Sequence, residues 1–176
     1  MINPIRSKKD QKNTEVIYEH IMNVQKATIT DIDVLVNLRI EYLKEDNGFL
    51  DQSDAAVITK SLPDYFQRHI GKDLFCYMIR DGNDIAACAF LLVVEKPMSP
   101  AFINGKTGTV LNVFTRPSYR HQGYAREIMD ELIADAKEMG LSRIELKSTE
   151  VGRSLYLSAG FRDDDSHYHL MKWSNI

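Results

Sequence analysis

The stretch RPSYRHQGYAREIM, residues 116–129, places one glycine among basic and polar side chains. It follows a β-rich run, TGTVLNVFT, and precedes an amphipathic helical pattern. At such a strand-to-helix junction, free backbone N–H groups converge with the positive end of the helix dipole, which suits a pyrophosphate. Gly123 and Ala125 are small enough to admit a phosphate close to the backbone, and Arg120 and Arg126 add positive charge. Taken alone, the stretch is either this anion site or a plain glycine turn that starts a helix.

Three other motifs that could do chemistry are not supported by their surroundings. The run GKT at 105–107 matches the end of a P-loop, but the first glycine would fall at Pro100 and a strand follows where a helix is needed. His167 and His169 would share one face of the expected last strand, as two zinc ligands could, yet such a pair without a third ligand is more typical of an edge strand. A GxSxG nucleophile elbow does not occur. No metal site is expected.

Length, composition and charge limit the class of protein. A chain of 176 residues fits one domain of ordinary size, and 44% hydrophobic with 27% charged residues is typical of a globular fold. The net charge of −3 and the pI near 5.9 argue against a dedicated nucleic-acid-binding protein. They still allow a local basic pocket for one phosphorylated ligand.

The cysteines and the hydropathy pattern indicate a cytoplasmic protein. Cys76 and Cys88 lie in apolar β-like runs without CxxC spacing, so we expect two reduced thiols in the core. No apolar run approaches the ~18 residues of a membrane span, and MINPIRSKKDQKN lacks the hydrophobic region of a signal peptide. We therefore expect neither secretion nor a membrane partner.

The elements that would position these residues follow from periodicity and turn signals. Residues 1–23 read as an N-terminal extension, with a helix in its second half, that is either a frayed tail or a functional arm. Thr28 and Asp31 resemble a helix cap, and Pro63 is expected to interrupt the second helix. The expected strands and helices are, in order, strand 24–27, helix 32–46, helix 53–70, a hairpin of strands 75–80 and 85–95 around the turn DGND, strand 107–115, helix 125–139, strand 143–149, short helix 152–160 and a last β region at 161–173. This order predicts a mixed α/β domain over residues 24–176, with a parallel crossover inside a mostly antiparallel sheet.

Two segments together resemble the signatures of the GNAT-type N-acetyltransferases. The run LNVFTRPSYRHQGYA is similar to the cofactor motif of that family, which ends in Arg-x-x-Gly-x-Ala. Downstream, SLYLSAGF (154–161) resembles the second signature, in which Leu-Tyr on a short helix precedes Gly-Phe. Each motif alone is degenerate, but both in this order, with a helix and a strand between them, are specific. The resemblance covers residues 24–173.

The resemblance implies a fold and a cofactor. A GNAT fold has a central, mostly antiparallel sheet flanked by helices, with a parallel strand pair that splays apart at the site for acetyl-CoA. The loop would bind the pyrophosphate of coenzyme A through main-chain amides, and the end of the preceding strand would bind the pantetheine arm. The residues carried over to cofactor binding are Val113, Phe114, Thr115, Arg120, His121, Gln122, Gly123, Tyr124, Ala125 and Arg126.

The resemblance also implies a catalytic residue and leaves others open. Tyr156 matches the tyrosine that protonates the coenzyme A thiolate in this family. Asn112 stands near the position where many relatives carry a glutamate base, so the base is either Glu150 or a water chain. A second departure is the run STEVGRS, where relatives carry an asparagine and where Ser148, Thr149 or Ser154 would contact the cofactor instead.

The acceptor is the part that the resemblance leaves open. Arg39, Glu41 and Tyr42 fall near enough in the family layout to line the acceptor side, and Arg39 either reaches the surface or faces a cleft. The pattern resembles a small bacterial branch that acetylates the amines of small molecules, and a peptide amine is also allowed. The alternative is a non-catalytic acyl-CoA-binding sensor or interaction module. A homodimer is possible, because the last strands often pair in this family, and Trp173 would then lie at the interface or cap the core.

Overall fold

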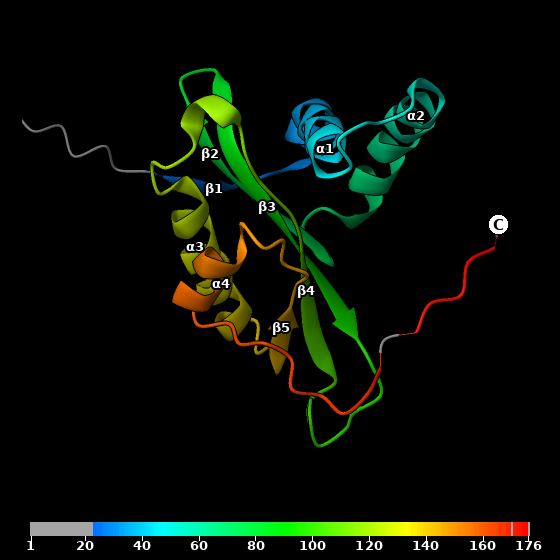
Figure 1. Cartoon of the computed structure of the whole chain (residues 1–176), viewed down its shortest axis with the longest axis vertical. Coiled ribbons are helices and arrows are strands. Elements are labelled where there is room, and N and C mark those ends of the chain that lie inside the picture. The colour runs from blue at the N-terminus through cyan, green and yellow to red at the C-terminus, as the bar shows by residue number, and fades with distance from the viewer. Residues whose placement is uncertain (1–22, 170, 176) are drawn as a thin grey trace, which may run out of the picture.

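Strands β1 to β5 form one mixed sheet in a computed structural model that describes residues 23–169 and 171–175 (Figure 1). The strands follow their chain order across the sheet, β1-β2-β3-β4-β5. Neighbours from β1 to β4 pair antiparallel, whereas β4 and β5 pair parallel. The strand bounds are β1 Val24–Lys26, β2 Leu74–Asp81, β3 Asp84–Glu95, β4 Lys106–Thr115 and β5 Arg143–Glu145.

Helices cover both faces of this sheet, and each face has its own apolar core. Helices α1 and α2 lie on one side and α3 with α4 on the other (Figure 1). Side chains of α1 and α2, including Leu38 and Phe66, pack against Cys88 and Phe90 of β3. Side chains of α3, including Met129, pack against Leu91 on the opposite face of the same strand. The helix bounds are η1 Ile29–Asp31, α1 Ile32–Asp46, α2 Gln52–His69, η2 Pro117–Tyr119, α3 Tyr124–Glu138 and α4 Arg153–Ser158.

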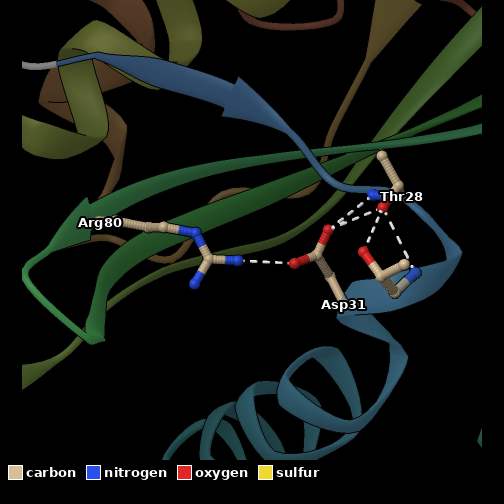
Figure 2. Close-up of polar contacts among 4 residues, drawn as sticks. Thr28, Asp31 and Arg80 are labelled. Carbon is tan, nitrogen blue, oxygen red and sulfur yellow. Dashed lines mark hydrogen bonds and ion pairs between the residues drawn. The ribbon is translucent and has the colours of Figure 1, made fainter.

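The capping box predicted at Thr28 and Asp31 is present, and it caps η1, the short turn that leads directly into α1, as Figure 2 shows. The Thr28 N–H donates to Asp31 Oδ2 at 2.8 Å, and Thr28 Oγ1 accepts from the Thr30 N–H at 3.3 Å. The other oxygen of Asp31 accepts from Arg80 Nη2 of β2 at 2.6 Å. One carboxylate therefore caps the start of this helical segment and joins it to β2, which sets where α1 passes over the sheet.

A buried polar cluster fixes α3 in the same way on the opposite face. Asp135 of α3 is 6% exposed and accepts from the Tyr77 hydroxyl at 2.8 Å. It also pairs with Lys26 Nζ of β1 at 2.6 Å. Burial, followed by the bond to Asp135, raises the pKa of Tyr77, so this phenol stays a donor. A paired and hydrogen-bonded carboxylate is tolerated in a core, and here it sets the position of α3 across β1 and β2.

The predicted fold class is confirmed, and three of its details are wrong. Helix α2 runs through Pro63 without the predicted interruption, because Leu62 and Phe66 on either side of it both pack into the α1–α2 core. The strand predicted at 143–149 ends at Glu145, since β4 and the chain after β5 diverge there. None of the helices in the described part of the chain has the length and hydrophobicity that a membrane crossing requires.

The third error concerns the C-terminal segment. The described residues between Phe161 and Asn175 form no strand, and Trp173 is 85% exposed, so it does not cap the core. Three consecutive aspartates, residues 163–165, place like charges side by side and have low strand propensity, which disfavours the predicted pairing. His167 and His169 consequently share no strand face. The extension predicted at residues 1–23 lies outside the described residues except for Asn23.

Candidate active site

Strand β4 carries a bulge where it passes α1. The pairing of β3 with β4 shifts register between Cys88 and Phe90, and Asn112 has a φ of 53°. Asparagine is among the residues that tolerate this left-handed region. The Asn112 side chain is buried: its Nδ2 donates to Cys88 Sγ at 3.4 Å, and its Oδ1 accepts from Arg39 Nη1 at 3.0 Å. The bulge is thus held from the sheet on one side and from α1 on the other.

Beyond this point β4 has an open edge. Its parallel ladder with β5 covers only Thr107–Thr109 against Arg143–Glu145, and the chain after β5 turns away toward α4 (Figure 1). Within the described residues, no strand pairs with that edge of β4 from Val110 to Thr115. At its end, the buried Oγ1 of Thr115 has no hydrogen-bond partner there either. An extended ligand with amide groups can bind such an edge as an added strand.

The loop after β4 presents a row of free backbone donors. Arg116, Tyr119 and Arg120 use their N–H groups within the loop or on β3. The backbone N–H groups of residues 121–125, however, donate no hydrogen bond to any described residue. His121 and Gly123 both have positive φ, at 61° and 88°, and this conformation turns the chain into the first turn of α3.

Two tyrosines anchor the loop below these donors. The rings of Tyr119 and Tyr124 meet edge to face, with centroids 6.0 Å apart. Tyr124 is buried in the core on the α3 face, and Tyr119 packs against that core. The free N–H groups therefore sit on a rigid turn at the positive end of a 15-residue helix.

The arginines around this loop are held by carboxylates of α1 and α3. Arg116 forms a two-point ion pair with Glu41, both distances being 2.8 Å, and this contact raises its pKa. Arg120 donates to Thr115 O at 3.0 Å and to the carboxylate of Glu45 at 2.5 Å. These pairs connect the loop to α1.

Arg126 joins the loop to the short helix α4. It pairs with Asp130 one turn along α3, at 2.7 Å. It also donates to the backbone oxygen of Ser158 in α4 at 3.0 Å. Arg126 therefore links the helix that starts at the loop to the helix that carries Tyr156.

Tyr156 lies half-buried on α4 and faces the core on the α3 side. Its ring packs edge to face on Phe161 at 6.0 Å. Burial raises its pKa, and the neighbouring Tyr42 raises it further. Tyr42 has this effect although 114 positions separate the two tyrosines in sequence. A phenol with a raised pKa keeps its proton at neutral pH and is therefore able to donate it.

Residues of α1 form the opposite wall. Tyr42 packs edge to face on Phe114 of β4, with centroids 6.3 Å apart. The Arg39 guanidinium lies over the Tyr42 ring at 5.3 Å. Arg39 therefore faces β4 rather than the surface, which decides between the two positions that the sequence allowed.

Comparison with known proteins places this arrangement in one family. Residues 37–161 match the acetyltransferase (GNAT) family. A predicted acetyltransferase from Clostridium acetobutylicum, whose crystal structure is with acetyl-CoA, is 31% identical and superimposes with a TM-score of 0.74 over 86% of this chain and 96% of its own. The chain belongs to the GNAT acetyltransferase family.

More distant GNAT structures share the fold. A GCN5-related N-acetyltransferase from Ralstonia eutropha is 23% identical, with a TM-score of 0.72 over 85% of this chain and 98% of its own. Glucosamine-6-phosphate N-acetyltransferase from Arabidopsis thaliana is 19% identical, with a TM-score of 0.65 over 88% and 99%. No curated protein sequence matches the chain significantly.

The residues predicted for acetyl-CoA, the donor that the GNAT family uses, lie together in the structure. Val113, Phe114 and Thr115 line the open end of β4, and residues 120–126 follow as the loop and the start of α3. The side chains of Phe114 and Tyr124 are in the core, so these two residues can contact a cofactor only through their backbone. Among the described residues, no cluster of three or more histidine, cysteine or acidic side chains is arranged to hold a metal ion.

The candidates left open by the sequence are now distinguished by their contacts. Asn112 is buried and bonded to Arg39, so it holds the bulge. Thr149 Oγ1 accepts from the Gly152 N–H and Ser148 donates to the Thr149 oxygen, which fixes the turn before α4. The Glu150 side chain is exposed in that turn and remains a candidate base.

Two contacts in the site were not predicted from the sequence. One is the pair Arg39–Asn112, which joins residues 73 positions apart. The other is Cys88, whose thiol faces the bulge and whose pKa burial raises to about 12. A thiol with that pKa is inert at neutral pH and acts as a packing group. The only sign of the Arg39–Asn112 pair in the sequence was an arginine on the apolar stripe of α1, and this pattern does not predict which residue the arginine contacts.

Proposed function

We propose that this chain transfers the acetyl group of acetyl-CoA to a primary amine of a small molecule or peptide, by direct attack of the amine in a ternary complex. The row of free backbone N–H groups at residues 121–125 is the observation that carries the proposal. These donors lie at a helix N-terminus, the arrangement that binds a pyrophosphate. Arg120 and Arg126 flank them and supply positive charge.

The open edge of β4 supports binding of the pantetheine arm. An added strand would use the backbone of Val113 to Thr115, and the unpartnered Thr115 hydroxyl would contribute one more hydrogen bond. A free N–H beside the Asn112 bulge would polarise the thioester carbonyl. Acetyl-CoA supplies the activated acetyl group, and the chain orients it.

Tyr156 supplies the proton in this proposal. Its half-buried hydroxyl holds a proton that passes to the sulfur as the carbon–sulfur bond breaks. The amine attacks in its deprotonated form, and its released proton passes to solvent or to Glu150. The rest of the rate enhancement comes from holding the amine and the carbonyl in contact.

The experiment that tests this proposal has two readouts. Acetyl-CoA is first added to the full chain, and we expect a rise in Tm that coenzyme A also produces. Release of free thiol is then followed with acetyl-CoA and a broad panel of primary amines. Absence of any thermal shift would overturn acetyl-CoA binding. A shift without turnover for any amine would instead favour the acyl-CoA sensor.

A further inference from the structure

Arg39 is a half-buried arginine that forms no ion pair with a carboxylate of the described residues. The other half-buried arginines of the described chain, Arg80, Arg116 and Arg120, each bond an acidic side chain. Within residues 23–169 and 171–175, the only hydrogen bond of Arg39 runs from Nη1 to the neutral amide oxygen of Asn112. The remaining N–H donors of its guanidinium have no described acceptor.

The acidic side chains that follow Arg39 on α1 interact with other residues. Glu41 is held by Arg116 and Glu45 by Arg120. Asp46 is one helical turn beyond Tyr42 and raises the pKa of that tyrosine, after burial, which is the larger cause. A partly buried cation without a counter-ion is costly, so a site of this kind favours an anion that arrives from outside.

The surroundings hold this guanidinium in one orientation. Its carbon lies 5.3 Å from the centre of the Tyr42 ring, a cation–π contact. Burial raises the pKa of Tyr65, and the charge of Arg39 opposes that rise, which brings Arg39 near α2 as well. An arginine fixed by an aromatic face and an amide oxygen presents its free edge as a planar fork, the geometry that carboxylates and phosphates match.

The fork also lies beside the place where transfer would occur. Asn112, its partner, is the bulge residue directly before Val113. Tyr42, the ring under it, is close enough to Tyr156 to raise the pKa of that hydroxyl. A ligand group bound to Arg39 would thus be held between the open edge of β4 and the proposed acid.

We infer that Arg39 binds an anionic group, a carboxylate or a phosphate, on the acceptor, so that the substrates are amines carrying a negative charge. This inference rests on the proposed function and names the substrate class of the same site. Arg39 contacts the substrate remote from the bond that forms, and it therefore acts in specificity.

Matched amines test the inference in the full chain. The pairs are β-alanine with β-alaninamide, phenylalanine with phenylalaninamide, O-phosphoethanolamine with ethanolamine, and glucosamine 6-phosphate with glucosamine. Acetylation is measured as kcat/KM from thiol release, and the first two pairs probe a carboxylate while the others probe a phosphate. We expect at least one anionic member to exceed its neutral partner by about tenfold or more.

Variants assign that preference to Arg39. Arg39→Gln should lower kcat/KM for the anionic amine by about 30- to 100-fold and change the neutral amine by less than about threefold. Arg39→Lys keeps the charge without the fork and should lie between them. Arg68→Gln, an exposed arginine of α2, is the matched control and should leave both rates unchanged. Comparing ratios between variants cancels differences in amine basicity.

Each outcome bears on one proposal or on both. The rise in Tm with acetyl-CoA confirms that each variant is folded, and the preference of the unmodified chain stands even where Arg39→Gln fails to fold. Neutral amines that react as well as their anionic partners would overturn the inference and leave the proposed function intact. A preference that survives Arg39→Gln would also overturn it, and so would a lack of turnover for every amine despite a thermal shift. Absence of acetyl-CoA binding would overturn both.

Discussion

The two walls of the site are built from different parts of the chain. The donor wall, formed by the end of β4, the loop and the start of α3, offers mainly backbone groups: free N–H donors at 121–125 and an open strand edge. The acceptor wall, formed by α1 and α2, offers side chains such as Arg39 and Tyr42. Backbone donors suit a ligand part that never varies, whereas side chains can be exchanged without changing the fold. The difference agrees with the proposed function, in which one wall binds a constant donor and the other a variable acceptor.

The largest expected effect comes from Tyr156→Phe, which removes the proposed acid and leaves the donor wall untouched. Turnover should fall by about 100-fold or more, as for loss of a general acid, while the Kd for acetyl-CoA stays within about twofold. Tyr168→Phe, which removes a hydroxyl from an exposed ring, is the control. Steady-state kinetics and calorimetric titration measure the two quantities. Unchanged turnover would exclude Tyr156 as the acid.

Gly123→Ala should impair binding of acetyl-CoA to the donor wall and leave the acceptor wall unchanged. Gly123 has a φ of 88°, where an alanine is strained by roughly 1–2 kcal/mol, and its N–H belongs to the row of free donors. The Kd for acetyl-CoA should rise by about tenfold or more. Gly71→Ala is the matched control, because its φ of 75° carries a similar strain in open space away from the site. If both variants weakened binding equally, strain rather than the cradle would be the cause.

Asn112 belongs to both walls, and two substitutions separate its roles. Asn112→Gly loses the bond to Arg39 but accepts the φ of 53°, whereas Asn112→Ala loses the bond and strains the backbone. We expect the alanine variant to be less stable than the glycine variant by roughly 1 kcal/mol in urea unfolding. Equal stabilities would mean that the side-chain bonds, and not the backbone conformation, hold the bulge.

Glu45→Gln should strengthen acetyl-CoA binding slightly, whereas Gly123→Ala should weaken it. The Glu45 carboxylate neutralises Arg120 at 2.5 Å, so a pyrophosphate must compete with it. Removing this exposed charge should tighten acetyl-CoA binding by about two- to threefold and leave the KM for the amine unchanged. Glu138→Gln makes the same change in net charge at the far end of α3 and should have no effect. Weaker binding in Glu45→Gln would show that this pair organises the loop.

The last prediction is that kcat does not decline at alkaline pH. Burial, aided by Tyr42, raises the pKa of Tyr156 above its ordinary value of about 10. A raised pKa keeps the acid protonated at every lower pH, so kcat should show no decline up to about pH 9.5. The rate should instead rise as the amine loses its proton and then level off. A fall in kcat with an apparent pKa below about 9 would contradict the assignment.

The sequence predicted the donor wall because its signals are local. A strand, a glycine and an amphipathic helix in succession specify a turn with free N–H groups whatever lies around it, and Gly123 has the positive φ that this turn requires. The capping box at Thr28 and Asp31 was predicted for the same reason, since it joins residues three positions apart. Turn signals likewise gave the β2–β3 hairpin.

The features that the sequence did not predict depend on distant packing. No local pattern pairs Arg39 with Asn112, because the order of the sheet and the path of α1 over it decide that contact. Packing also keeps α2 helical through Pro63. The strand predicted after Phe161 does not form in the described residues, because the three consecutive aspartates at 163–165 disfavour strand pairing there.

The bulge at Asn112 also changes which way the end of β4 faces. From Ala87 to Glu95, β3 advances eight positions, while β4 advances nine between their partners, Lys106 and Thr115. Side chains alternate along a strand, so that single extra residue reverses the alternation beyond it. Val110 consequently packs on the α3 side and Phe114 on the α1 side, although they are an even number of positions apart. Deleting one residue between them would leave the two side chains three positions apart, where simple alternation alone puts them on opposite faces, so the bulge could be removed without turning Phe114 away from Tyr42.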